Sequence, residues 1–203
     1  MTAYGANMPR PSLKDQRSQE ILEAYLTCVA RFGLDGATQE RIAEVAGVKR
    51  PLLRHYLGNK DEMVAALAKY VVAGFAEALE GLRQALPSGA TPSDLVEALF
   101  AGDSGTDPRL MLAYQALVTA VPDRPELRQD LMDSLTDFFD VVEDILRRAT
   151  PNAPDTSIRA VTQGMSAIFV SMDALSPLDP PKVWRAELKL AASLLASTLE
   201  ASS

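Results

Sequence analysis

The stretch that decides the fold is residues 38–57, which read TQERIAEVAGVKRPLLRHYL. It contains two short helical segments, residues 39–46 and residues 50–57, on either side of a glycine. Thr38 is a natural N-cap for the first segment, because its hydroxyl can accept a hydrogen bond from a free amide of the first turn. Gly47 readily takes the positive φ that ends one helix and redirects the chain into the next. Two short helices joined by a tight turn predict a helix-turn-helix.

The side chains of this stretch divide into an inner and an outer set. Two helices that cross steeply need a small residue at their contact, and Ala43 supplies it. The predicted core beneath the turn consists of Ile42, Val48, Leu53 and Leu57. The side chains left to point outward are Lys49, Arg50, Leu52, Arg54, His55 and Tyr56. A helix with such an outer face suits the major groove of DNA, which has room for one helix.

The remainder of the chain also reads as helix. Alternating β-branched runs bounded by Asn-Gly or Asp-Gly are absent, so no strand is predicted. Apolar residues at three- and four-residue spacings indicate a helix over residues 17–32 and a much longer one that starts at Asn59 or Lys60. Further helices are predicted at 92–100, 108–121, 125–149, 156–175 and 181–200, with prolines at most of the breaks. The predicted fold class is all-α, with an N-terminal three-helix head that holds the helix-turn-helix and a C-terminal helical bundle.

The formal net charge of −7 is unevenly divided along the chain. Residues 1–60 hold nine Lys and Arg against six Asp and Glu, which gives +3. Residues 61–203 hold eleven against twenty-one, which gives −10. A basic head on an acidic body favours DNA contact by the head alone, although a chance fluctuation explains the division equally well.

Several other classes of protein are disfavoured. A chain with one Cys and one His lacks the usual ligands of a zinc site, so no metal and no cofactor are predicted. Nucleophilic catalysis needs a base beside Ser or Cys, but Cys28 lies on the apolar side of the first helix and His55 lies in the second helix of the motif. Four acidic residues recur at helical spacing, namely Asp137, Asp140, Glu143 and Asp144. They could bind a cation, but a solvated helix face is the better interpretation. An enzyme is therefore the least favoured reading.

The lone cysteine also bears on the compartment. It excludes an internal disulfide and fits a reducing cytoplasm. The sequence has no run of about 18 apolar residues that would predict a membrane span. Near the N-terminus no apolar segment follows a basic cluster, so no signal peptide is predicted. We expect a cytoplasmic protein without membrane contact.

One set of motifs points to a known family. It comprises Thr38, the pair Ile42-Ala43, the turn Ala46-Gly47-Val48, the pair His55-Tyr56 and the pair Lys60-Asp61. As a set, over residues 17–65, these motifs resemble the TetR family of bacterial transcriptional repressors. The chain departs from the family at four positions. The family often has Ser or Thr at the position of Lys49 and usually Tyr at that of Arg54. It usually has His at the position of Tyr56 and Phe at that of Leu57. The departures change which DNA contacts are expected, whereas Leu57 keeps an apolar side chain in the core.

The resemblance implies that the head binds a double-stranded DNA operator. Thr38 and Lys60 are expected to bind phosphate at helix N-termini, together with Tyr56. Arg50 and Arg54 are expected to contact bases or backbone, because a guanidinium can hold a phosphate or a guanine edge. For His55, packing on the head is an equally good alternative. The predicted DNA-binding residues are Thr38, Gln39, Lys49, Arg50, Pro51, Leu52, Arg54, His55, Tyr56 and Lys60.

By the same resemblance, the body binds a small-molecule effector and forms a homodimer. Methionine and aromatic side chains adapt to varied apolar ligands, and Tyr114 and Gln115 could add polar anchors. The predicted ligand-binding residues, each with core packing as its alternative, are Met111, Tyr114, Gln115, Phe138, Met165 and Phe169. The last two helices carry little charge, which favours packing against a symmetry mate. The predicted dimer interface consists of Met165, Ile168, Met172, Trp184, Leu188, Ala191 and Leu195.

The sequence therefore predicts three regions and one function. The regions are a flexible arm over residues 1–16, a DNA-binding domain over residues 17–60, and a ligand-binding and dimerisation domain over residues 61–203. The function is that of a dimeric repressor of a palindromic operator with half-sites about 34–36 Å apart, released by an apolar or aromatic effector. A co-repressor-dependent regulator or an activator with the same head stays an open alternative.

Overall fold

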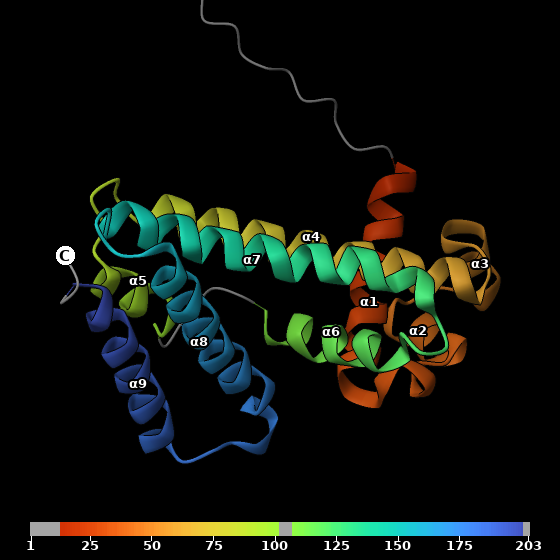
Figure 1. Ribbon diagram of the computed structural model, residues 1–203. Helices are drawn as coiled ribbons and strands as arrows, with labels where there is room; N and C mark the ends of the chain where they lie inside the picture. Colours follow the sequence, from red (N-terminus) through yellow and green to blue (C-terminus); the bar gives the residue numbers. More distant parts are fainter. Residues whose placement is uncertain (1–12, 102–106, 201–203) are drawn as a thin grey trace, which may run out of the picture. The chain divides into compact units, whose positions relative to one another are not determined.

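The computed structural model describes residues 13–101 and 107–200 of the chain. Within these two ranges the regular elements are all helices, and none is a β-strand (Figure 1). The predicted all-α class is confirmed. No helix in the described ranges is both long and apolar enough to cross a lipid bilayer. The chain divides into two compact units, residues 1–67 and residues 68–203, which we call the head and the body.

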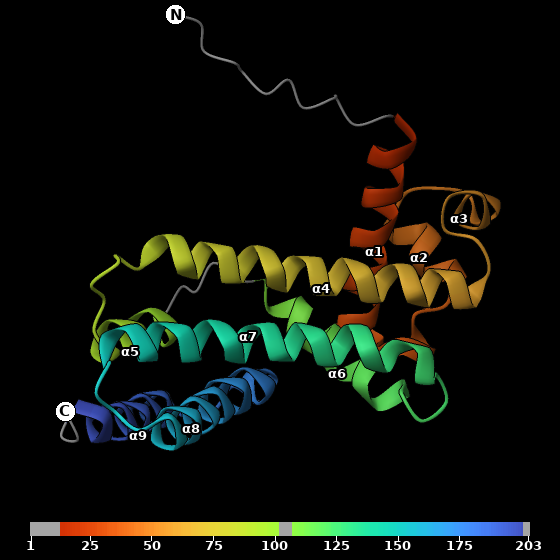
Figure 2. The same cartoon turned by 45° about the horizontal axis from the view of Figure 1, so that its top comes forward.

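From Leu13 onward, the described part of the head consists of three helices and the start of a fourth. These are α1 (Leu13–Gly36), α2 (Gln39–Val45), α3 (Arg50–Leu57) and the first turns of α4 (Lys60–Ala85). Helices α2 and α3 pack against α1 and against each other, and Figure 2 shows the group. The buried stripe of α1 follows the three- and four-residue spacing of an amphipathic helix. Its members are Ile21, Ala24, Tyr25, Leu26, Cys28 and Val29.

Helix α1 begins four residues earlier than predicted, at Leu13 rather than Arg17. Residues 13–16, assigned by prediction to a flexible arm, form its first turn, because no Gly or Pro interrupts them and Leu, Lys and Gln favour helix. The rest of the predicted arm, residues 1–12, lies outside the described residues. At the other end, Gly33 has φ 70° and breaks the helical conformation at the predicted place.

The boundary between head and body falls within α4, after Leu67 rather than after Lys60. Met63, Val64 and Leu67 are buried, and they belong to the head. The sequence prediction placed the boundary at the first residue of α4, because the cap there is a local signal. Which unit buries the first turns of a helix depends on contacts that are distant in sequence.

The described residues of the body contain the remainder of α4 and five further helices. They are α5 (Pro92–Leu99), α6 (Pro108–Ala120), α7 (Arg128–Ala149), α8 (Asp155–Ala174) and α9 (Lys182–Glu200), with 3₁₀ turns at Pro125–Leu127 and Ser176–Leu178. Helix α8 packs against both α7 and α9, and α9 also packs against α5 (Figure 2). Helices α8 and α9 approach closely at Gly164, where a Cβ would lie 2.9 Å from Cδ1 of Leu195 and that side chain would have to shift.

The core of the body gathers apolar side chains from α5, α7, α8 and α9. Its buried members are Leu95, Val96, Leu99, Phe100, Val141, Val142, Ile145, Leu146, Ala153, Ile158, Val161, Met165, Met172, Ala192, Ala196 and Leu199. Most of them recur every three or four residues along their helices, so each helix buries one face. This pattern agrees with the helical spacing read from the sequence.

Candidate nucleic-acid interface

The turn between α2 and α3 is built from backbone hydrogen bonds. The amide of Val48 donates to the carbonyl of Ala43 at 2.9 Å, and the amide of Gly47 donates to the carbonyl of Glu44 at 3.2 Å. This pair of bonds is a Schellman motif, whose left-handed position favours glycine. Gly47 occupies that position with φ 63°. The turn predicted at Gly47 is confirmed.

Helix α2 begins at a well-anchored end. Thr38 Oγ1 accepts a hydrogen bond from the amide of Arg41 at 3.4 Å, which confirms the predicted cap. The guanidinium of Arg41 donates to the carbonyl of Gly36 at 2.6 Å and lies over the Phe32 ring, 4.5 Å from its centroid. A cation above an aromatic face is attracted by the ring quadrupole. These contacts hold the connection from α1 to α2 and thereby place Thr38.

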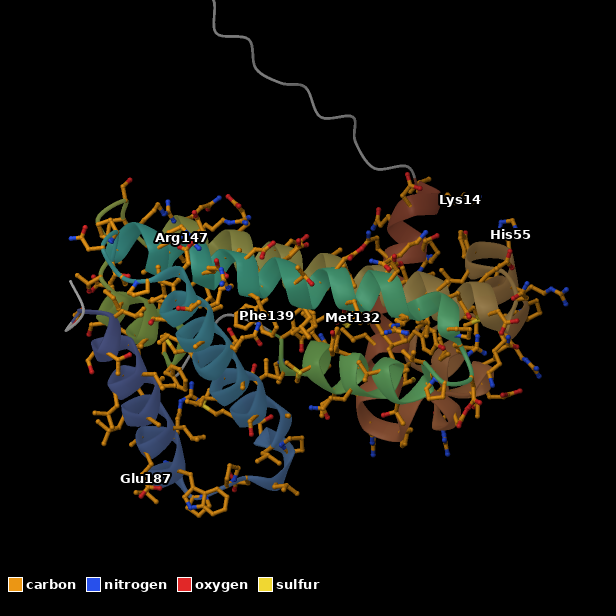
Figure 3. The ribbon with its side chains drawn as sticks, in the orientation of Figure 1. Lys14, His55, Met132, Phe139, Arg147 and Glu187 are labelled. Atoms are coloured by element: carbon orange, nitrogen blue, oxygen red, sulfur yellow. The ribbon has the colours of Figure 1, made fainter. Side chains whose placement is uncertain are left out.

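Helix α3 has one buried side and one exposed side. Leu53 and Leu57, one helical turn apart, are 0% and 8% exposed. The exposed residues of α3 and its N-cap are Lys49, Arg50, Pro51, Leu52, Arg54 and His55. Figure 3 labels His55, which projects from the outer side of α3, and its ring meets the half-buried Tyr56 ring edge-on at a centroid distance of 5.0 Å. Because the two leucines bury one side of α3, the opposite side, with Lys49, Arg50 and Arg54, is exposed and cationic.

Lys60 is exposed and is the first residue of α4. This helix begins with a capping box formed by Asn59 and Glu62. Oδ1 of Asn59 accepts from the amides of Asp61 at 2.9 Å and Glu62 at 3.1 Å. In return, Oε2 of Glu62 accepts from the amide of Asn59 at 2.7 Å. Gly58, with φ 82°, makes the connection from α3. This reciprocal cap fixes the start of α4.

Two of the predicted DNA-binding residues contact each other. Arg50 Nε donates to Oε1 of Gln39 at 3.1 Å, and Arg50 Nη1 pairs with Oε1 of Glu40 at 2.6 Å. Sequence reasoning missed Glu40, because nothing local to one exposed acid shows that it will face an arginine of the next helix. Thr38, Gln39, Lys60 and the outer face of α3 all belong to the same compact unit.

Cys28 is a structural residue of the head. It is 0% exposed, and burial raises the pKa of its thiol above the ordinary value, with Arg41 opposing and Glu44 adding to the shift. A raised pKa keeps the thiol protonated, and a protonated thiol is a poor nucleophile. Cys28 therefore packs as a small apolar side chain.

Comparison with known proteins places this head in a family. Residues 21–67 match the family model described as "Bacterial regulatory proteins, tetR family". The head therefore belongs to the TetR family. The match begins inside α1 and ends at Leu67, where the head itself ends.

Similarity to individual TetR-family regulators extends beyond the head. The chain is 29% identical over 125 residues to the HTH-type transcriptional regulator BetI of Serratia proteamaculans, a span of 60% of this chain and 63% of that protein. It is 36% identical over 94 residues to the HTH-type transcriptional repressor AcnR of Corynebacterium jeikeium, covering 44% of this chain and 50% of the repressor. The chain thus matches less than two thirds of the length of these relatives.

A solved structure shares the fold over both units. It is that of the TetR-family transcriptional regulator from Cytophaga hutchinsonii, which matches with a TM-score of 0.77 and 15% identity. The match covers 94% of this chain and 98% of that chain. The TetR-family fold, a helix-turn-helix head followed by a helical C-terminal unit, therefore extends over the body.

Three of the six residues predicted to bind a ligand in the body come together in its core. Met165 is buried there, and the half-buried Phe138 and Phe169 pack against the same cluster. The ring centroids of Phe138 and Phe169 are 5.6 Å apart, and those of Phe169 and Phe100 are 6.1 Å apart. The body thus has an aromatic cluster beside a methionine, supplied by three helical segments.

The other three predicted residues, Met111, Tyr114 and Gln115, are half-buried on α6. The ring of Tyr114 meets that of Phe75 edge-on at a centroid distance of 5.6 Å. Its hydroxyl donates to the carbonyl of Leu131 at 2.9 Å, and burial raises the pKa of the phenol. The donor hydrogen of Tyr114 is therefore engaged within the body.

A pocket of about 220 Å³ lies elsewhere in the body, near the C-terminal ends of α4 and α7. Its lining residues are Arg83, Leu86, Pro87, Ser88, Ala90, Val141, Asp144, Ile145 and Arg148. None of the predicted ligand-binding residues belongs to it. Arg83 pairs with Glu80 at 3.8 Å and Arg148 with Asp144 at 3.1 Å, so its charged groups are already matched by neighbours on their own helices.

Two hydroxyl groups that sequence reasoning overlooked are buried on α8. Thr162 and Ser166 are 1% and 0% exposed, and neither side-chain oxygen has a hydrogen-bond partner among the described residues. Thr27, Thr119, Thr136, Thr150 and Ser193 behave differently, because each donates to the carbonyl four residues earlier. Thr162, Ser166 and Phe169 are spaced so that they share one face of α8. Sequence alone gave no signal, since whether a helical hydroxyl bonds back depends on its rotamer.

The residues predicted to form a dimer interface differ in accessibility. Met165 is 0% exposed and Met172 is 9% exposed, so both fill the core of their own body and offer little surface. Ile168, Leu188, Ala191 and Leu195 are half-buried, and Trp184 is 51% exposed. The more exposed apolar residues of α9 are Val183, Leu190 and Leu194, at 56%, 59% and 61%. Their seven- and four-residue spacing places them on one face, a signal that the sequence prediction did not use.

Proposed function

We propose that the chain is a dimeric transcriptional repressor that binds a palindromic DNA operator and is released by a small apolar or aromatic effector. The observation that carries the proposal is the outer face of α3. Lys49 and Arg54 are exposed there while Leu53 and Leu57 anchor the opposite face in the head. A short helix held in this way can enter the major groove and present cations to phosphates and base edges. The match to the TetR family supports the same reading.

Each predicted contact has a place in this proposal. Thr38 and Lys60, at the starts of α2 and α4, bind phosphate through the Thr38 hydroxyl and the Lys60 ammonium, close to the positive ends of those helix dipoles. Arg54 reads a base edge, and Leu52, which is 40% exposed, meets a thymine methyl. The rest of the contact surface consists of Gln39, Lys49, Arg50, Pro51, His55 and Tyr56.

Operator binding by the full chain tests the proposal. An operator selected from a random duplex library is titrated over a range of salt with the wild-type chain, Arg54→Ala and Lys60→Ala. Arg54→Ala is expected to weaken operator binding about tenfold to a hundredfold and to reduce the preference over random DNA, because a base contact is lost. Lys60→Ala is expected to weaken both DNAs alike and to lower the salt slope by about 0.9, because one phosphate contact is lost.

Arg128→Ala is the matched control, because it removes the same charge from an exposed position of the body. It is expected to leave binding and salt slope within experimental scatter. A wild-type chain that prefers no duplex over random DNA, or an Arg128→Ala loss as large as that of Arg54→Ala, would contradict the proposed role of the head.

Effector binding is placed in the body, at the aromatic cluster of Phe138 and Phe169. The unpaired hydroxyls of Thr162 and Ser166 support this, because a buried hydroxyl without a partner is costly and a ligand can repay that cost. The rings would accept the apolar part of the effector, and the hydroxyls its hydrogen-bonding group.

Thr162→Val is expected to raise the free energy of unfolding of the unliganded body by about 1–2 kcal/mol. The change is isosteric and removes a buried hydroxyl that has no hydrogen-bond partner in the described part of the chain. Thr150→Val is the matched control, since Thr150 is 2% exposed but donates to the carbonyl of Leu146 at 2.9 Å. That variant is expected to lose about 1 kcal/mol. Equal losses for the two variants in urea denaturation would mean that Thr162 is hydrogen-bonded in the folded body.

Dimerisation is placed on the outer side of α9. Val183, Leu190 and Leu194 form an exposed apolar stripe there, and such stripes mark interaction surfaces. A twofold axis would pair the stripe with its copy and set two heads at operator spacing. Leu190→Glu and Leu194→Glu should each shift the chain toward monomer in sedimentation measurements.

The effector and the DNA would communicate through α4. This helix starts with Lys60 in the head and continues to Ala85 in the body, so a change in its position in the body reaches the head. Release by about 30–150-fold requires the effector to bind the non-operator state more tightly by about 2–3 kcal/mol. Operator affinity measured with and without a bound effector gives this coupling directly.

A further inference from the structure

Arg50 of α3 is held on two edges by residues of α2. Its Nε donates to Oε1 of Gln39 at 3.1 Å, and its Nη1 pairs with Oε1 of Glu40 at 2.6 Å. The amide of Gln39 is itself oriented, because Nε2 donates weakly to Sδ of the buried Met63 at 3.7 Å. Arg50 is therefore tied through α2 to the first turn of α4.

These contacts orient a side chain more than they stabilise the fold. The side chains of Arg50 and Glu40 are 60% and 63% exposed, and an ion pair so exposed contributes little to stability. A guanidinium has five N–H donors in a rigid planar fork. Its Nε–H donates to Gln39 and its Nη1 lies against the Glu40 carboxylate, so the orientation of the fork and of its remaining donors is set.

The ion pair also places a negative charge beside the face that meets DNA. A phosphate of any duplex must compete with the Glu40 carboxylate for Arg50. A base edge at the right position can use the remaining donors without breaking the pair. The acid therefore lowers affinity for DNA in general and spares a matching sequence.

We propose that Glu40, together with Gln39, is a positioning residue that determines operator specificity by clamping Arg50. The inference rests on the proposed DNA-binding function. The clamp keeps Arg50 from pairing with phosphates on random DNA and directs its free edge to a base on the operator. Removing the clamp should thus strengthen binding to random DNA and reduce the preference for the operator over random DNA. Loss of a contact that only stabilises the fold would not produce this combination.

The test compares Glu40→Gln with Glu44→Gln in the full chain. Glu44 is exposed on the same short helix, and no ion pair of its side chain is found among the described residues, so the two variants change the charge of α2 equally. Binding is measured to the selected operator and to a random duplex, each over a range of salt. Thermal unfolding is recorded for both variants.

Glu40→Gln is expected to tighten binding to the random duplex, to steepen its salt slope by about 0.9 and to reduce the operator-to-random ratio about tenfold. Glu44→Gln should leave the ratio and the slope unchanged. Glu40→Asp keeps the charge but shortens the side chain, and should lower the ratio through lost geometry alone.

Two results would overturn the clamp. One is an equal change in random-duplex affinity and in the operator-to-random ratio for Glu40→Gln and Glu44→Gln. The effect would then come from the loss of one negative charge on α2 and not from the release of Arg50. The other is a fall of both affinities together with the melting temperature, which would make the pair a structural brace. If the wild-type chain prefers no duplex, the proposed function fails separately, and the random-duplex salt slopes of the two variants still decide whether Glu40 restrains Arg50.

Discussion

The head is expected to lose about 2–5 kcal/mol of stability when Leu53 is replaced by alanine. Leu53 is 0% exposed and is one of two leucines that bury α3. A small domain has a stability of roughly 5–15 kcal/mol, so this loss is a large fraction of what holds the head together. Because head and body are separate compact units, the body should stay folded.

Two probes separate the units in the Leu53→Ala variant. Trp184, the single tryptophan of the chain, lies in α9 and reports on the body by fluorescence. Amide hydrogen exchange in α1 to α3 reports on the head. Leu52→Ala is the matched control, since Leu52 is 40% exposed and the loss of its side chain should change stability by less than about 0.5 kcal/mol. Equal exchange in the two variants would show that Leu53 does not anchor α3.

The parts of the head that could be predicted from the sequence rest on local signals. Thr38 caps α2 through an amide three residues on, and the turn at Gly47 is made by bonds that reach back only three and five residues. Their residue types and spacing determine these structures with little help from the rest of the fold. The start of α1 was missed because its first turn lacks a sharp cap signal, and fraying ends are the least determined part of a helix.

Features that depend on distant contacts were not predictable. The sequence placed Arg50 on an outer face but could not reveal that Gln39 and Glu40 hold it. In the body, the spacing of apolar residues located the helices, yet it did not tell which apolar face is covered. Met165 was predicted at a dimer interface and is buried in its own core, whereas Leu190 is exposed. When a helix is apolar on several sides, tertiary packing determines which side is buried in the core and which stays exposed.

Gly58→Ala is expected to destabilise the head through the backbone rather than through lost packing. Gly58 has φ 82° and ψ −151°, a region that is essentially restricted to glycine and costs other residues about 1–3 kcal/mol. A Cβ at this position would also lie 2.1 Å from Oε2 of Glu62. That oxygen accepts from the amide of Asn59 at 2.7 Å, so moving it away breaks the capping box at a further cost of about 1 kcal/mol.

The matched substitution is Gly81→Ala, in the exposed part of α4 within the body. A Cβ on Gly81 would meet no atom within 4 Å, and its backbone is helical. This variant should gain about 0.5–1 kcal/mol, because alanine loses less conformational freedom in a helix than glycine. Urea denaturation and hydrogen exchange of both variants measure the two effects in the same chain. If Gly58→Ala is as stable as the wild type, the chain can pass from α3 to Lys60 without a left-handed residue, and the capping box does not depend on glycine.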